Sequence, residues 1–135
     1  MDVPRSAPRM RVGVDIASAA DVRESIETFG DRYLDRIFTP HEREVCQGPI
    51  DRMATRLAAR FAAKEAVIKV LRPHAAAPNW RCMEVRTDSA GWSDLVLTGA
   101  AHEMAQAAEL RDFSLSMSHD HDVATAVVVA VQEGT

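Results

Sequence analysis

The sequence predicts an α+β fold of one domain, in which an antiparallel sheet packs against a long central helix. Residues 10–16 alternate apolar and polar side chains as a strand does, and residues 51–71 are rich in alanine and leucine without glycine or proline, as is typical of a helix. Strand and turn patterns then dominate residues 83–131. A chain of 135 residues with 47% hydrophobic content can bury the core of one such domain.

The first strand is expected to bury one face. Its apolar residues are Met10, Val12, Val14 and Ile16. We interpret these side chains as the buried face, which leaves Asp15 on the other face near the end of the strand. Residues 1–9 hold two prolines and little that can pack, so they are predicted to be a mobile tail before a folded domain at residues 10–135.

Capping signals divide the segment between this strand and the central helix. Ser18 is an N-cap candidate for a first helix, and Gly30 separates that helix from a second. Thr39 followed by Pro40 and Glu42 combines a capping hydroxyl, a proline at the first helical position and a glutamate at the third. A third helix is therefore predicted to begin at Pro40.

The segment after the central helix is predicted to contain mostly strands. Turn residues at 88–91 indicate a hairpin, residues 100–109 form an alanine-rich helical pattern, and residues 113–117 alternate again. Residues 119–122, His-Asp-His-Asp, are predicted to be a polar turn, because neighbouring side chains in a tight turn diverge and rarely share a metal. Residues 123–131 are nearly all Val and Ala, which fits a strand buried on both faces.

One carboxylate interrupts the apolar stripe of the central helix. The stripe consists of Met53, Leu57, Phe61, Ile68 and Leu71. Glu65 lies where a further apolar residue would fit the helical period, so it needs a cation, a hydrogen-bond donor or a metal if it is buried. The alternative is a helix-border glutamate paired with Lys69 one turn later, and the helix alone leaves both interpretations open.

Composition excludes several classes of protein. A net charge of -4 argues against nonspecific nucleic-acid binding, and no apolar run approaches the length that crosses a bilayer. Cys46 and Cys82 lie far apart without a CxxC pair, so a disulfide framework or zinc site is not predicted. The sequence contains no GxSxG motif, so a serine hydrolase is not predicted. We expect a cytoplasmic protein with neither a nucleic acid nor a membrane as its partner.

Charged residues suggest phosphate chemistry. Asp15 and Glu65 are hard oxygen ligands of the type that hold Mg²⁺ together with water and substrate phosphate. Arg60, Lys64 and Lys69 surround Glu65 in sequence and supply the positive charge that phosphate oxygens require. The alternative is a set of solvated surface ion pairs.

Four segments in fixed order match one family. They are Gly13–Ile16, Phe38–Glu42, Arg60–Lys69 and Ser116–His119. With these segments the chain resembles the holo-acyl-carrier-protein synthases, which are short, single-domain 4'-phosphopantetheinyl transferases. The resemblance covers about residues 10–131. It implies the 4'-phosphopantetheinyl transferase fold, with one domain per chain.

The resemblance implies an enzyme that transfers 4'-phosphopantetheine from coenzyme A to a serine of an apo-acyl carrier protein and releases 3',5'-ADP. Asp15 and Glu65 then correspond to the Mg²⁺ ligands, and Glu65 also to the base that activates the serine, directly or through water. Lys69 corresponds to a catalytic lysine at the phosphate. The implied coenzyme A contacts are Arg60, Lys64, Lys69 and His119. Short members of this family form homotrimers with the site between subunits, so His119 would come from a neighbour.

The first helix departs from the family pattern. Asp21 stands where the family usually has an arginine, and Ser18 stands where it often has a glutamate. Arg23 is the nearest substitute for a basic carrier-protein contact. Weaker complementarity to an acidic carrier leaves open whether the carrier belongs to fatty acid biosynthesis or to a polyketide or peptide pathway.

Two other functions remain open at this stage. One is a catalytically idle module that binds coenzyme A or a carrier protein, which the acidic first helix mildly favours. The other is a Mg²⁺-dependent pyrophosphohydrolase of coenzyme A-like substrates. Retention of Asp15, Glu65 and Lys69 argues against the idle module.

Overall fold

A computed structural model describes residues 7–133 of the chain. Its elements are β1 (Arg9–Ser18), α1 (Ala19–Phe29), α2 (Asp31–Ile37), α3 (Pro40–Cys46), α4 (Ile50–Leu71), a 3-10 turn (Trp80–Cys82), β2 (Met83–Thr87), β3 (Ser93–Leu97), α5 (Gly99–Ala107), β4 (Leu110–Asp120) and β5 (Val123–Gln132). Residues 1–6 of the predicted tail lie outside the described residues, and the strand already begins at Arg9.

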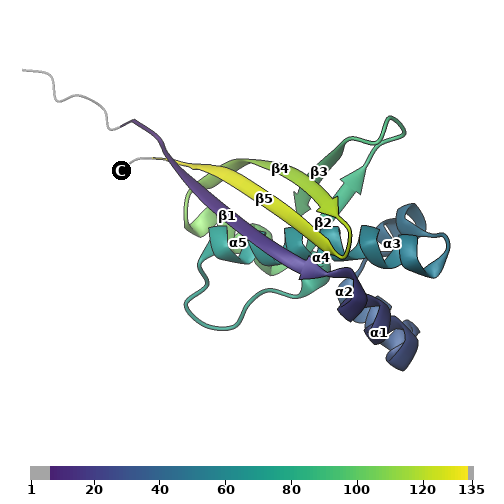
Figure 1. Cartoon of the computed structure of the whole chain (residues 1–135). Helices are drawn as coiled ribbons and strands as arrows, with labels where there is room; N and C mark the ends of the chain where they lie inside the picture. Colours follow the sequence, from purple (N-terminus) through teal and green to yellow (C-terminus); the bar gives the residue numbers. More distant parts are fainter. Residues whose placement is uncertain (1–6, 134–135) are drawn as a thin grey trace, which may run out of the picture.

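The main sheet has the strand order β1-β5-β4 and is antiparallel throughout. Helix α4 runs behind this sheet and packs against β1 and β5 (Figure 1). Strand β1 pairs with the last strand, so Arg9 lies opposite Gln132 and the two ends of the described chain meet at the same edge of the molecule. The predicted α+β architecture, an antiparallel sheet on one long helix, is confirmed.

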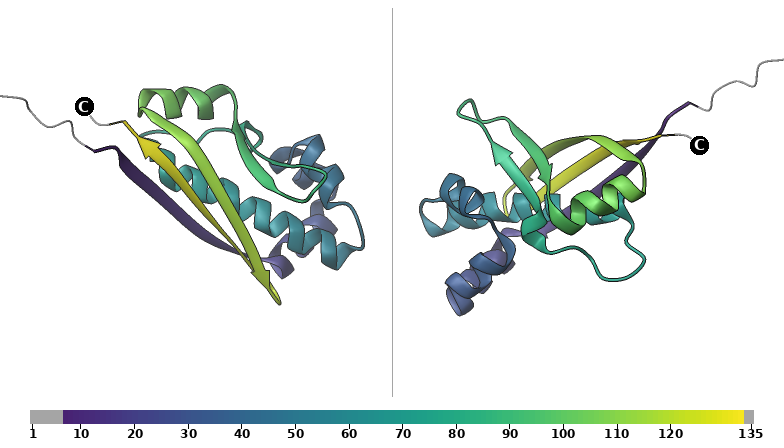
Figure 2. Two further views of the ribbon diagram at one scale, coloured as in Figure 1. Left: turned by 90° about the horizontal axis from the view of Figure 1, so that it is seen from above. Right: turned by 180° about the vertical axis from the view of Figure 1, so that it is seen from behind.

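The smaller elements cover the two ends and the back of α4. Helices α1, α2 and α3 gather at its N-terminal end, whereas the β2–β3 hairpin and α5 lie behind the main sheet (Figure 2). The hairpin pairs Met83 with Leu97 and Thr87 with Ser93, as the turn signal predicted. The capping box at Thr39 is also present, since its hydroxyl accepts from the N–H of Glu42 and its own N–H donates to the Glu42 carboxylate.

The predicted orientation of β1 is wrong. Met10, Val12, Val14 and Ile16 are 52–67% exposed, and the other face of the strand packs against α4. Gly13 explains this contact, because a Cβ atom there would lie 2.2 Å from the carbonyl oxygen of Ala66 on α4. Glycine lets the strand approach the helix backbone closely.

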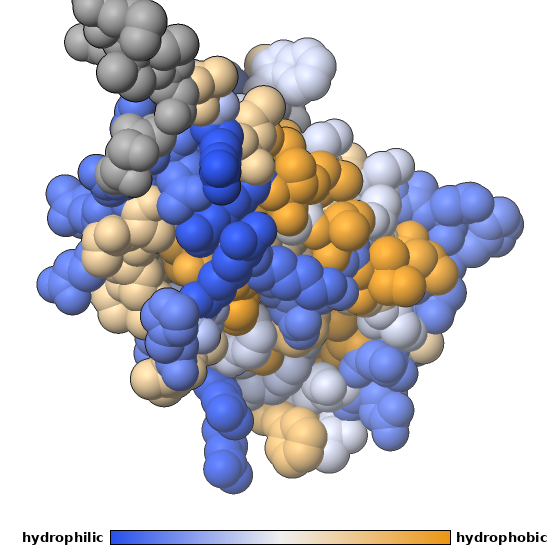
Figure 3. Space-filling model, turned by 90° about the vertical axis from the view of Figure 1, so that its left-hand side faces the viewer, coloured by the Kyte–Doolittle hydropathy of each residue, from blue (hydrophilic) through white to orange (hydrophobic). Residues whose placement is uncertain are grey.

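Strand β5 is likewise buried on one face rather than on both within the described chain. Ala124, Ala126, Val128 and Ala130 are buried beneath α4, whereas Val123 and Val127 are 48% and 36% exposed. The outer sheet face, which we define as the outward apolar side chains of β1 and β5, therefore lacks a cover from this chain's described residues. Hydrophobic surface gathers beside hydrophilic side chains on the face shown in Figure 3.

Among the described residues, none of the helices combines the length and the apolar character that crossing a membrane requires.

Candidate active site

Asp15 and Glu65 meet between strand β1 and helix α4. Asp15 lies on the face of β1 that turns toward α4, and its carboxyl group is close enough to that of Glu65 to help raise the pKa of Glu65. Lys69, one turn beyond Glu65, donates from Nζ to the carbonyl oxygen of Val14 at 2.8 Å and lies 3.4 Å from Oδ1 of Asp15. The structure thus brings three predicted site residues into one cluster, which we call the carboxylate cluster.

This environment raises the pKa of Glu65 from its ordinary value of 4.5 to about 7. Burial contributes most, because it disfavours the charged form, and the hydrogen bond and charge of Asp15 add to the rise while Lys69 opposes it. A carboxyl group that titrates near neutral pH is suited to accept and release a proton in a reaction.

The carboxylate cluster fits a hard divalent cation. Two carboxylates held against each other repel when both are ionised, and a cation between them removes that repulsion. Mg²⁺ is commonly bound by one or two carboxylates with water and substrate phosphate as the other ligands. In residues 7–133 no group of three or more His, Cys, Asp or Glu side chains is placed to hold a metal, so an all-protein metal cage is not available there.

Arg60 lies on α4 with one unsatisfied donor. Its side chain is 9% exposed, Nη1 donates to the carbonyl oxygen of Arg56, and Nη2 donates to the hydroxyl of Thr87, both at 3.2 Å. Its Nε is buried and has no hydrogen-bond partner in the described part of the chain. A buried guanidinium hydrogen without an acceptor is a suitable partner for an anionic oxygen.

The structure corrects the prediction that Lys64 contacts coenzyme A. Its side chain is 0% exposed. Nζ donates to Oε1 of Glu42 at 2.8 Å, to the carbonyl of Met83 at 2.8 Å and to the carbonyl of Trp80 at 3.0 Å. An ammonium group has three hydrogens, so Lys64 has none left for a ligand. Its role is to join α4 to α3 and to the start of β2.

His119 does not join the carboxylate cluster of its own chain. It lies exposed on β4 opposite Ala124 of β5, which in turn lies opposite Ala17 of β1. Two strand spacings of about 4.8 Å separate β4 from β1 by roughly 10 Å. Arg23 is also engaged elsewhere, since it pairs with Glu27 at 2.6 Å and with Asp51.

Comparisons with known proteins identify the family. A sequence profile described as the 4'-phosphopantetheinyl transferase superfamily matches residues 11–128. The chain is a member of this superfamily. Holo-[acyl-carrier-protein] synthases of Koribacter versatilis and Desulforudis audaxviator are 38% and 39% identical over 118 and 121 residues, which cover 87% and 89% of this chain and 94% and 91% of those proteins. The expected membership among the holo-[acyl-carrier-protein] synthases is confirmed.

Solved synthase structures share the fold. A Chronobacterium ammoniagenes apo-ACPS structure superposes with a TM-score of 0.80 at 30% identity and covers 95% of this chain and 100% of its own. The ACPS–CoA complex of that organism gives a TM-score of 0.79 at 30% identity, covering 93% and 99% of the two chains. The acyl carrier protein synthase of Mycobacterium tuberculosis gives 0.69 at 35% identity, covering 88% and 94%.

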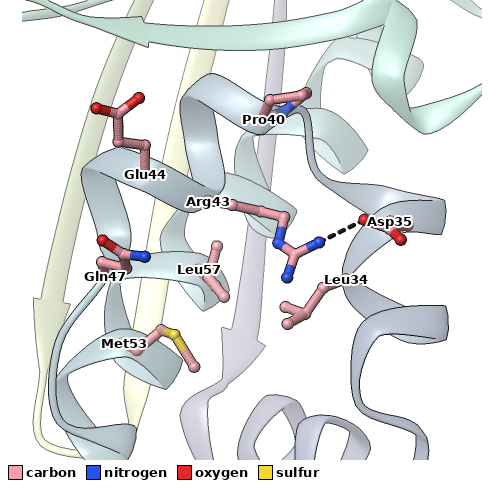
Figure 4. A pocket seen from close by; sticks show the side chains of 8 residues that line it. All are labelled: Leu34, Asp35, Pro40, Arg43, Glu44, Gln47, Met53 and Leu57. Atoms are coloured by element: carbon pink, nitrogen blue, oxygen red, sulfur yellow. Dashed lines mark hydrogen bonds and ion pairs between the residues drawn. The ribbon is translucent and has the colours of Figure 1, made fainter.

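One cavity of this synthase lies away from the carboxylate cluster. It has a volume of about 440 Å³ between α2, α3 and α4, and Figure 4 shows the eight side chains that line it. Arg43 crosses this cavity to pair with Asp35 and also pairs with Asp31 at 2.8 Å. Arg43 is already paired with two carboxylates. This cavity is therefore a less suitable binding site for a phosphate than the Nε of Arg60, which has no acceptor among residues 7–133.

Sequence reasoning missed the part that Glu42 plays. Its carboxylate is 1% exposed and accepts from Lys64 as well as from the backbone N–H groups of Thr39 and Val85, at 2.8–2.9 Å. The capping motif explained only the bond to Thr39. Lys64 was a signal for the other bonds of Glu42, because a lysine surrounded by alanines on the central helix is unusual unless it is buried and paired.

Proposed function

We propose that this synthase transfers 4'-phosphopantetheine from coenzyme A to a serine hydroxyl of an apo-acyl carrier protein in the presence of Mg²⁺ and releases 3',5'-ADP. The observation that supports this most is the contact between Asp15, Glu65 and Lys69. Family membership provides the reaction class, and the cluster provides the groups that this reaction needs in this chain.

Asp15 and Glu65 are the residues that would hold the metal, as their shared, half-buried position allows. When bound, Mg²⁺ neutralises charge on the pyrophosphate oxygens of coenzyme A. Lys69 adds positive charge at the same place. Its ammonium uses two hydrogens on Val14 and Asp15, so a third remains to donate to a phosphate oxygen.

Glu65 is the proposed base. It accepts the proton of the carrier serine, directly or through one water molecule, as the serine oxygen forms a bond to the phosphorus that carries pantetheine. The bond from that phosphorus to the bridging oxygen breaks, and the electron pair leaves with 3',5'-ADP. A cavity of about 290 Å³ between β1, α1 and α4 is lined in part by Ile16, which follows Asp15 in the chain, and by Phe61, one helical turn before Glu65. We assign it as the route by which a carrier serine approaches.

Arg60 and His119 are proposed coenzyme A contacts. The unpartnered Nε of Arg60 suits a phosphate oxygen of the nucleotide. His119 is exposed and distant from Asp15 along the sheet, so we assign it to the site of a neighbouring chain. This assignment requires an oligomer.

We propose a homotrimer in which the outer sheet face lies between subunits. Met10, Val12, Val14 and Ile16 are each more than half exposed and form one continuous row on β1. Large apolar patches of this kind mark interaction surfaces in soluble proteins. Burial by a second copy would also make β5 a strand that is covered on both faces, as its Val and Ala composition predicts.

The direct test is the intact mass of an apo-acyl carrier protein incubated with coenzyme A, Mg²⁺ and the synthase. Wild type should add the mass of one phosphopantetheine, and Glu65→Gln should slow that gain by about 100-fold or more, since general bases contribute roughly 10²–10⁴. Turnover of Glu65→Gln at the wild-type rate would remove Glu65 from the role of base.

Asp15→Ala should raise the Mg²⁺ concentration required, and an unchanged metal titration would remove Asp15 from the site.

The same assay separates the alternatives. Release of 3',5'-ADP without any carrier protein would indicate a pyrophosphohydrolase. Binding of coenzyme A without mass gain on any carrier of a panel from fatty acid, polyketide and peptide pathways would indicate a binding module. The panel also identifies the class of carrier.

A further inference from the structure

A separate cavity lies at the C-terminal end of helix α4. It has a volume of about 520 Å³ and is enclosed by β1, the loop after α4 and helix α5. Ligand-binding pockets commonly have volumes of about 300–1,000 Å³. Figure 3 views this end of the molecule and shows strongly hydrophilic side chains next to hydrophobic surface. None of the residues that line this cavity belongs to the carboxylate cluster.

The polar side chains that line the cavity are all basic. Arg11 reaches it from β1, Arg72 from the end of α4, and His74 from the following loop. No carboxylate forms an ion pair with Arg11 or Arg72 within residues 7–133. Burial and the nearby charge of Arg72 lower the pKa of Arg11 below its usual value. The two guanidinium groups therefore repel each other, and no acidic side chain of the described residues is paired with either of them.

The end of helix α4 compensates only part of this charge. Nη1 of Arg11 donates to the carbonyl oxygen of Val70 at 3.0 Å in the last turn. A helix C-terminus carries roughly half a negative charge, whereas two guanidinium groups carry two positive charges. Nε of Arg11 is buried and has no acceptor among residues 7–133. An anion at this position would supply both the missing charge and the missing acceptor.

The floor of the cavity is apolar. Leu71 is 4% exposed and belongs to a hydrophobic core cluster, and Met104 and Ala108 pack against that same cluster. Ala107 and the alanines of the loop complete the lining. A bare inorganic ion would leave this floor in water, whereas a ligand with an apolar body would cover it.

We propose that this cavity binds an organic anion whose carboxylate or phosphate group pairs with Arg11 and Arg72 while its apolar body covers the floor formed by Leu71, Met104 and α5. The planar guanidinium group of arginine presents paired N–H donors that match the oxygens of either a carboxylate or a phosphate. The inference does not depend on the proposed transferase activity, because binding is measured without coenzyme A or a carrier protein.

The test is calorimetric titration of the full chain with sodium decanoate, sodium acetate and inorganic phosphate in separate runs. Decanoate should bind saturably at one site per chain, and acetate and phosphate should bind at least about tenfold more weakly because they lack an apolar body. Equal binding of phosphate and decanoate would overturn the amphipathic ligand. Absence of saturable decanoate binding would overturn the site.

Two variants locate the ligand without disturbing the fold. Arg72 has a φ of 51°, which glycine adopts freely, so Arg72→Gly removes the charge without backbone strain and should weaken decanoate binding about tenfold or more. Ala107→Leu should occupy the apolar part of the cavity with a larger side chain and weaken decanoate binding by a similar factor. Matched controls are Arg52→Ala at the other end of α4 and Ala100→Leu at the start of α5, neither of which lines the cavity. Equal effects of variants and controls would overturn the location.

Discussion

At Glu65, burial and the neighbouring carboxyl group of Asp15 together produce a raised pKa and a candidate metal site. The side chain shares a partly buried position with Asp15, so its charged form is disfavoured when no cation is present. In sequence the same glutamate also fitted the interpretation as a helix-border residue paired with Lys69. The structure instead directs Lys69 to Val14 and Asp15, so both side chains of α4 face the same strand.

We expect Mg²⁺ to stabilise the protein more at pH 8 than at pH 5. In the metal-free fold Glu65 has a pKa of about 7, against 4.5 as its ordinary value, so the stability gained from its extra proton is complete below pH 4.5 and lost as the pH rises through 7. At pH 8 Glu65 is ionised beside the carboxyl group of Asp15, and a divalent cation would offset the negative charge that accumulates there. Thermal unfolding with and without Mg²⁺ at each pH measures the effect.

Glu65→Gln serves as the control for this prediction. Without a titrating group at position 65, the variant should lose most of the Mg²⁺ stabilisation at pH 8 and should be less sensitive to pH between 5 and 8 in the absence of metal. If Mg²⁺ stabilises Glu65→Gln as much as wild type, the cation binds elsewhere.

Lys64→Met should destabilise the fold strongly. The change leaves the carboxylate of Glu42 buried without its cation, and removing one partner of a buried ion pair costs about 3–5 kcal/mol in the free energy of unfolding. Urea denaturation measures the loss. Lys69→Met removes a lysine that is 53% exposed and should cost about 1 kcal/mol or less. Similar losses in the two variants would contradict the structural role of Lys64.

At the scale of elements, strand β1 serves two partners. Its inner face carries Gly13 and Asp15 against α4, and its outer face carries four apolar side chains without a cover from the described chain. The close approach at Gly13 brings Asp15 to the level of Glu65 and Lys69. The outer face provides the surface through which a second copy would bind.

Val14→Glu should dissociate the proposed trimer. Val14 is 52% exposed in the single chain, so the variant chain still folds, but a carboxylate in a subunit interface would be buried without a partner. Analytical ultracentrifugation should give the mass of three chains for wild type and of one chain for the variant.

Val96→Glu is the matched control for assembly. Val96 is also an exposed valine on a strand, at 36%, but it belongs to the separate β2–β3 sheet. It should leave the trimer intact. A wild-type chain that sediments as a monomer, or a Val14→Glu variant that still sediments as a trimer, would contradict the proposed interface.

At the scale of the whole molecule, charge should govern the choice of carrier protein. The net charge of -4 gives the chain no general attraction to an acidic carrier, and Arg23 is paired with Glu27 and Asp51. Asp21 is exposed in the first turn of α1. A carrier that approaches α1 would therefore meet an acidic residue and a neutralised arginine.

Asp21→Arg should lower the KM for an acidic carrier protein severalfold and leave kcat unchanged. The substitution replaces repulsion with attraction during encounter, while the carboxylate cluster is untouched. Initial rates over a range of carrier concentrations separate the two constants. Glu103→Arg, an equal change of charge at an exposed position of α5, should have little effect. An equal decrease in KM for both variants would mean that only the overall charge matters.

Local signals predicted most elements and the residues of the cluster. The cap at Thr39, the break at Gly30 and the uninterrupted central helix depend on interactions within a few residues, and each is found where the sequence predicts it. The order of motifs also predicted the family and thereby Asp15, Glu65 and Lys69 together. These features are local or are carried by a fixed motif, so a single sequence contains them.

Only the tertiary structure decided which side of each element faces the core. Alternation in β1 predicted two faces but assigned the apolar one to the interior, whereas the close approach of Gly13 to Ala66 turns that face outward. By residue type, Lys64 was a candidate phosphate ligand. The carboxylate of Glu42, which is distant in sequence, instead holds Lys64 in a buried ion pair. Burial depends on partners far away in sequence, and neither periodicity nor residue type contains that information.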